Sequence, residues 1–132
     1  DGKPLTKHFR IRDAVIAFNT LVNNASNLEI GYDGGGFQGN WWHLPPVGML
    51  IENNIIIGTH DTLIKIFAQP VNSMWTNNVV WASGNAVVAR TSINGVQVSD
   101  PRLVKTRGVW HMPNRPPRYY PLIRSDVGPD AK

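Results

Sequence analysis

The sequence predicts an α+β fold in which helices pack on one face of a curved sheet. Two stretches, residues 11–22 and 60–68, have apolar side chains at helical spacing. Strand patterns dominate the later part of the chain, over residues 78–82, 86–93 and 103–112. Helices first and antiparallel strands afterwards are the order typical of this class.

Composition limits the classes of protein to which the chain can belong. It has 132 residues, 42% of them hydrophobic and 17% charged, which is the size and balance of one globular domain. It has no cysteine, so disulfides and thiolate metal sites are excluded. No apolar run approaches the roughly 20 residues that span a bilayer. We expect a soluble, cytoplasmic protein, although a start at Asp1 rather than Met suggests processing or trimming.

The first expected helix follows a polar N-terminal arm, residues 1–10. It begins at Ile11 and ends near Asn23 and Asn24, two residues that tolerate a left-handed backbone. Residues 28–32 form either a short helix or an extended piece. The apolar stripe of the first helix consists of Ile11, Ala14, Val15, Phe18, Leu21 and Val22.

An aromatic strand over residues 37–44 is the central element of this prediction, and Pro45 and Pro46 stop it. Residues 47–57 are either one strand or a loop followed by a strand. The second expected helix begins at about His60, with Thr59 as its N-cap, and ends at Ala68.

The remaining elements are strands. Residues 78–82 and 86–93 flank Ser83-Gly84-Asn85, a composition typical of a hairpin turn. Residues 118–124 follow a proline-rich turn and form a last strand, and residues 125–132 form a frayed tail. We detect no internal repeat.

This layout resembles the nuclear-transport-factor-2-like superfamily, and within it the branch of SnoaL-like polyketide cyclases and limonene-epoxide-hydrolase-type enzymes. The resemblance covers one domain, residues 11–124. It depends on the order and spacing of four segments, which are Asn40–Pro46, Gly58–Leu63, Val79–Ile93 and Thr106–His111.

The resemblance implies a cone-shaped fold whose curved, mixed or antiparallel sheet carries helices on its concave face and encloses an apolar cavity. It also implies acid–base chemistry without a cofactor, and pairing into a homodimer. Trp41 and His43 stand where the epoxide hydrolases have Tyr and Asn. Where they have Arg and Asp on the middle strand, this chain has either Arg90 and Ser92 or, in the adjacent register, Thr91 and Ile93. The aspartate is therefore missing, which argues against epoxide hydrolysis.

Three residues are the candidates for catalysis. His43 is the candidate acid or base, because imidazole titrates near neutral pH, and the alternative is a structural histidine. Arg90 stabilises a developing anion if it faces inward, and is an ordinary surface cation if it faces outward. Asp61 either orients His43, acts as a base, or only complements the dipole of the second helix.

The candidate substrate-binding residues are large apolar side chains that line either a cavity or the core: Trp41, Trp75, Trp81, Trp110, Phe67 and Met49. A metal site formed by His43, His60 and Asp61 is disfavoured, because neighbours on a helix point apart.

The sequence thus predicts an enzyme that acts on a small hydrophobic, possibly polycyclic, molecule as a cyclase, isomerase, dehydratase or hydrolase. The main alternative is a non-catalytic ligand-binding or oligomerisation module. Nucleic-acid binding is less favoured, because the net charge of +4 is spread over scattered residues.

Overall fold

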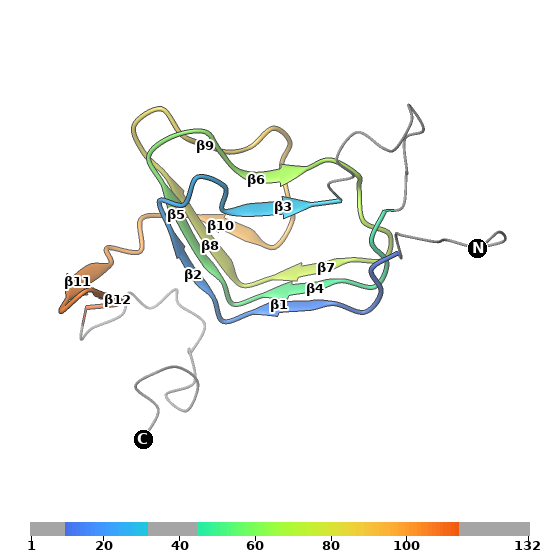
Figure 1. Ribbon diagram of the computed structural model, residues 1–132, viewed down its shortest axis with the longest axis horizontal. Helices are drawn as coiled ribbons and strands as arrows, with labels where there is room; N and C mark the ends of the chain where they lie inside the picture. Colours follow the sequence, from blue (N-terminus) through green and yellow to red (C-terminus); the bar gives the residue numbers. More distant parts are fainter. Residues whose placement is uncertain (1–9, 32–44, 114–132) are drawn as a thin grey trace, which may run out of the picture.

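The computed structural model describes residues 10–31 and 45–113, and these residues form strands and turns with no helix. The α+β prediction is therefore wrong, and so is the cone with helices packed on its sheet. Instead, the chain winds in successive coils, and each coil contributes one strand to each of three sheets (Figure 1). This arrangement is a parallel β-solenoid.

The first sheet has the strand order β1-β4-β7, and the third has the order β3-β6-β9. The second sheet has four strands, in the order β10-β8-β5-β2. All neighbours in these three sheets are parallel, which contradicts the expected antiparallel sheet. The strands are β1 (Val15–Ala17), β2 (Thr20–Val22), β3 (Leu28–Ile30), β4 (Leu50–Glu52), β5 (Ile55–Gly58), β6 (Thr62–Ile66), β7 (Met74–Thr76), β8 (Asn78–Ala82), β9 (Val87–Ala89) and β10 (Val96–Val98).

The two predicted helices and the predicted hairpin become parts of successive coils. Residues 11–22 form β1 and β2, and residues 60–68 contain β6. β8 and β9 are strands as predicted, but they belong to different sheets and do not pair with each other. Residues 47–57 were predicted as one strand or as a loop followed by a strand. The structure has two strands there instead, β4 and β5.

A column of three asparagines, of which Asn54 and Asn78 are buried and Asn19 is exposed, joins the coils at the corner between the first and second sheets. Asn19 Nδ2 donates to Asn54 Oδ1 at 3.0 Å, and Asn54 Nδ2 donates to Asn78 Oδ1 at 2.9 Å. Asn78 Nδ2 in turn donates to the Ile51 carbonyl at 2.8 Å. The residue before each asparagine has a left-handed backbone, at Phe18, Asn53 and Asn77, so the chain bends at the same place in each coil.

The spacing in this column shows a repeat that the sequence analysis missed. Asn54 and Asn78 are 24 residues apart, whereas Asn19 and Asn54 are 35 apart. The longer first coil contains residues 32–44, which lie outside the described residues together with the predicted aromatic strand.

The core fills the space between the three sheets with stacked aliphatic side chains. Each inward position lies against the equivalent position of the next coil, as Leu21, Ile56 and Val80 do in the second sheet. The main buried cluster consists of Leu28, Ile30, Met49, Ile51, Ile56, Leu63, Ile64 and Val80. Parallel sheets of this kind are stable only when such faces are covered.

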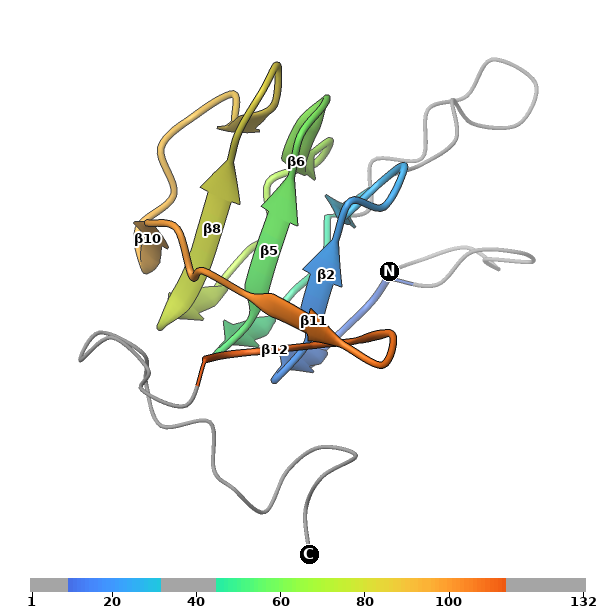
Figure 2. The same ribbon diagram turned by 90° about the vertical axis from the view of Figure 1, so that its left-hand side faces the viewer.

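The second sheet is covered on its outer side as well. A two-stranded antiparallel hairpin, β11 (Val104–Thr106) and β12 (Val109–His111), crosses in front of this sheet (Figure 2). Arg107 and Gly108 form its turn with positive φ angles of 50° and 88°, the combination that a tight two-residue hairpin turn requires. The outward residues Ile55 and Val79 are buried, and so is Pro101, on the segment leading to the hairpin.

Candidate functional site

The candidate site is a groove at the edge of the third sheet, at the place where β9 ends. β9 pairs with β6 only through Thr62–Val87 and Ile64–Ala89, so the rest of β6 has β3 as its partner. The groove, called the side groove below, has a volume of about 520 Å³. Its lining comes from β6 and from the chain that leaves β9: Asp61, Thr62, Ile64, Lys65, Ile66, Phe67, Ala89, Arg90 and Thr91.

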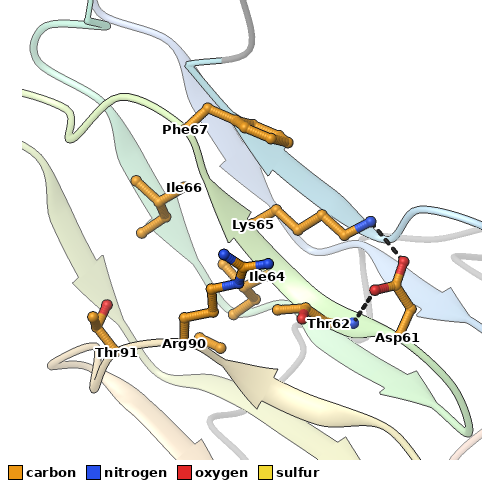
Figure 3. Close-up of a pocket in the computed structure, with 9 residues that line it drawn as sticks. Asp61, Thr62, Ile64, Lys65, Ile66, Phe67, Arg90 and Thr91 are labelled. Carbon is orange, nitrogen blue, oxygen red and sulfur yellow. Dashed lines mark hydrogen bonds and ion pairs between the residues drawn. The ribbon is translucent and has the colours of Figure 1, made fainter.

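Three of the residues singled out in the sequence lie in this groove. Asp61, Arg90 and Phe67 are brought together although they were assigned to separate elements. Figure 3 shows the Arg90 side chain extending toward β6 and Phe67 lying beyond Lys65, at the far end of that strand from Asp61. All three side chains are exposed, and the Phe67 ring is 53% exposed.

An ion pair fixes one end of the side groove. Lys65 Nζ donates to Asp61 Oδ2 at 2.7 Å and lies 3.6 Å from Glu29 Oε1 (Figure 3). Asp61 does not cap a helix. It has a left-handed backbone in the turn before β6, and its Oδ1 accepts the Thr62 N–H at 2.7 Å.

These contacts determine the protonation of the pair. The hydrogen bond from Lys65 lowers the pKa of the Asp61 carboxyl, and the Thr62 N–H lowers it further. The hydrogen bond to Asp61 raises the pKa of Lys65. Both groups are therefore charged at neutral pH, and Asp61 is a weak base. A carboxylate in this state is poorly suited to remove a proton from a substrate.

Arg90 is in a different position from Lys65. Within the described ranges, no carboxylate or other group forms an ion pair or hydrogen bond with its guanidinium. Its side chain faces outward, so of the two alternatives for Arg90 the structure shows the exposed one. The side groove therefore contains one neutralised lysine and one arginine whose five N–H donors have no partner among the described residues.

The other predicted substrate-binding residues lie elsewhere. Met49 is a core residue, and Trp75 packs against the core. Trp81 is half-buried on β8, and Trp110 is 39% exposed on the hairpin, where Lys105 Nζ lies 5.4 Å from its ring centre. None of these four lines the side groove. His43 and Trp41 lie outside the described residues.

Sequence reasoning did not select Lys65, Thr62 and Thr91 for this groove. The signal for Lys65 was its position four residues after Asp61, but in a presumed helix this pair looked like ordinary surface charge. In the described part of the chain, no group of three or more acidic, histidine or cysteine residues is placed to hold a metal ion. No helix there is long and apolar enough to cross a membrane.

Comparison with protein-family models, with curated proteins and with solved structures finds no match for this chain.

Proposed function

We propose that the side groove binds an extended acidic saccharide, and that it does so without catalysis. The observation that carries this proposal is Arg90, a guanidinium with no partner among the described residues, in an open groove beside an exposed aromatic ring. A planar guanidinium binds a carboxylate through two parallel hydrogen bonds, which makes a ligand with carboxylate groups the best match.

The rest of the lining suits a sugar ring. The face of a pyranose is apolar and its rim carries hydroxyls, so it needs a flat apolar surface together with a few polar groups. Phe67 offers the exposed ring, while the hydroxyls of Thr62 and Thr91 and the Asp61 carboxylate offer hydrogen-bond partners. A uronic acid combines such a ring with a carboxylate.

The shape of the groove favours a chain over a compact molecule. It follows β6 from Asp61 to Phe67 and is open to solvent, with both charged and apolar walls. A small hydrophobic substrate would lack a partner for Arg90 and would leave that guanidinium beside apolar surface. Catalysis at this groove is disfavoured by the lowered pKa of Asp61.

Binding of a uronic-acid tetrasaccharide, measured by calorimetry, tests this proposal, with a neutral glucose tetrasaccharide as the ligand control. We expect Arg90→Gln to weaken binding of the acidic ligand by about 10- to 100-fold, because a hydrogen-bonded charge pair contributes about 1.5–3 kcal/mol. Arg102→Gln is the matched protein control, since Arg102 is also exposed but does not line the groove. Equal affinity for the two ligands, or an unchanged affinity in Arg90→Gln, would contradict the proposal.

The earlier prediction of acid–base catalysis depends on His43 and stays separate from this groove. It is tested by the turnover of candidate small hydrophobic substrates by the wild-type chain and by His43→Ala. If catalysis by His43 occurs, the variant loses turnover while its affinity for the acidic saccharide is unchanged.

A further inference from the structure

The last coil of the solenoid covers the three sheets unequally. β10 adds a fourth strand to the second sheet, and the Gly95 carbonyl just before it accepts the N–H of Asn78, the first residue of β8, at 3.2 Å. A Cβ at Gly95 would come within 1.9 Å of the Trp75 carbonyl oxygen, which shows how closely this segment covers the first sheet. For β9 of the third sheet, the only pairing strand in the described ranges is β6.

An inward side chain is left uncovered beside β9. Val98 is in register with Val80, and both continue the stacked column of the core. Val80 is fully buried, whereas Val98 is 59% exposed. A residue that points along the core column and still contacts solvent marks a place where one more layer would bury apolar surface.

The uncovered place is a cleft, called the end cleft below, with a volume of about 250 Å³. Its lining is aliphatic apart from three polar residues, and it contains one charged group, Arg90, and no acidic one. The lining residues are Val88, Ala89, Arg90, Thr91, Ser92, Ile93, Val96 and Val98. The cleft thus offers a strand edge that no strand of the described residues covers, together with an apolar floor and one positive charge.

We propose that the end cleft binds an extended segment of a partner protein, which pairs with the free edge of β9 as an added strand. An added strand forms backbone hydrogen bonds with the edge, and its alternate side chains enter the cleft. Charge complementarity selects the segment: aliphatic residues face Val88 and Val98, and a carboxylate at the end of the strand pairs with Arg90. β9 is three residues long, so the added strand pairs with it over about three residues.

The probe for this proposal is a fluorescently labelled pentapeptide with valine at positions 1 and 3 and glutamate at position 5, which share one face of a strand, and with serine at positions 2 and 4. It is compared with the same peptide carrying lysine instead of glutamate. Fluorescence anisotropy is expected to show that the full chain binds the glutamate peptide with a Kd below about 1 mM, at least 10-fold more tightly than the lysine peptide. In Arg90→Glu this preference reverses. A peptide methylated on its backbone nitrogens does not bind, because it cannot pair with β9.

The protein variants localise the binding. Val98→Lys is expected to weaken peptide binding at least 10-fold, while Val15→Lys has no effect. Val15 is the matched control, because it is a valine of similar exposure, 63%, on the outer face of the first sheet. Circular dichroism and the melting temperature show whether both variants keep the fold.

The two proposals share Arg90 but can fail separately. Phe67→Ala is expected to weaken saccharide binding and leave peptide binding unchanged, and Val98→Lys is expected to do the opposite. The strand-addition proposal is overturned if neither peptide binds, if the preference does not follow the charge at position 90, or if Val15→Lys weakens binding as much as Val98→Lys.

Discussion

At the scale of the residue, the two cations of the side groove differ in what surrounds them. Lys65 lies between two carboxylates, so its charge is already balanced, whereas Arg90 has no carboxylate partner among the described residues. If the side groove binds the proposed acidic saccharide, we expect ligand affinity to depend on the arginine and local stability to depend on the lysine. Two adjacent positive charges thus have separate roles, which substitution can distinguish.

Because of the Asp61–Lys65 ion pair, we expect the stability of the fold to depend on pH. Because the folded state lowers the pKa of Asp61, the pair stabilises the fold above about pH 4, and this contribution is lost as the pH falls through the lowered pKa. Asp61→Asn keeps a side chain that tolerates the left-handed turn but removes the charge. We expect the variant to unfold at lower urea concentration than the wild type at about pH 7, and we expect this difference to shrink as the pH falls below about 4. An equal difference at all pH values would show that the charge is not involved.

A substitution at Arg90 tests whether the planar shape of the guanidinium matters for ligand binding. Arg90→Lys keeps the positive charge but loses the planar pair of donors, so it should recover only part of the affinity for a uronic-acid ligand. We expect affinity between those of the wild type and Arg90→Gln, measured by calorimetry. Full recovery in Arg90→Lys would mean that charge alone binds the ligand and that the two parallel hydrogen bonds are not formed.

At the scale of the element, the short strands depend on the corners between them. Each strand has three to five residues, too few to be stable alone, and the asparagine column fixes where each coil turns. Asn54 uses every polar atom of its side chain: Oδ1 accepts from Asn19, and Nδ2 donates to the Ile16 carbonyl and to Asn78. This corner therefore fixes the path of the chain more strictly than do the short strands that it joins.

Asn54→Ala should destabilise the protein by about 2–4 kcal/mol, because it leaves buried donors and acceptors of the neighbouring coils without partners. Asn53→Gly is the matched control. Residue 53 has a left-handed backbone with a φ of 53°, which glycine adopts without strain, so we expect a change within about 0.5 kcal/mol. Urea denaturation measures both. Equal destabilisation by the two variants would show that the corner needs only its backbone conformation and not the hydrogen bonds of the column.

The same corners explain why the sequence misled the prediction. Over residues 11–22, two strands are separated by a bend at Phe18 and Asn19, and the bend interrupts the alternation of a strand. The interrupted alternation leaves apolar residues three and four apart, which is the spacing of a helix. The strand at 78–82 has no such bend and was predicted correctly, as β8. Within 86–93 only β9 is a strand, and a turn at Arg107 and Gly108 divides the single strand predicted at 103–112 into β11 and β12.

A repeat was present in the sequence and would have indicated the fold. Pro-Val occurs at 46–47 and 70–71, and Asn-Asn occurs at 53–54 and 77–78, both with the 24-residue spacing of the coils. The first coil hides the pattern because it is longer and has Phe-Asn at the corner.

For the side groove, Asp61, Arg90 and Phe67 were named from the sequence, but their proximity could not be predicted, because it arises from the parallel stacking of β6 and β9.

At the scale of the whole molecule, the solenoid is stabilised mainly by contacts between adjacent coils. Such architectures behave as a series of layers, so damage at one end remains local. This property separates the protein from a globular α+β domain, in which one core connects all the elements.

The content of secondary structure gives a direct test of the fold. The far-ultraviolet circular dichroism spectrum should have a single minimum typical of β-sheet, without the paired minima of helices, because the described residues contain no helix. A helical spectrum in buffer without alcohol would contradict the β-solenoid and would restore the α+β prediction.

A second test concerns the last coil of the solenoid, which contains Gly95 and β10. Gly95→Ala places a methyl group against the Trp75 carbonyl, so it should detach the last layer, and hydrogen exchange should become faster at β10 while the amides of β4 and β5 keep their protection. Gly108→Ala is the control, since no atom lies within 4 Å of the added carbon and only the hairpin turn is strained. Faster exchange throughout the molecule in Gly95→Ala would mean that the coils unfold as one unit.

The unequal spacing of the asparagines, 35 residues and then 24, has a consequence for how such a chain can change over time. The first coil is eleven residues longer than the second (35 against 24), yet its three strands, β1, β2 and β3, stay in register with β4, β5 and β6. The number of residues between β3 and β4 is thus uncoupled from the register of the strands, and we expect an insertion or deletion there to leave that register intact.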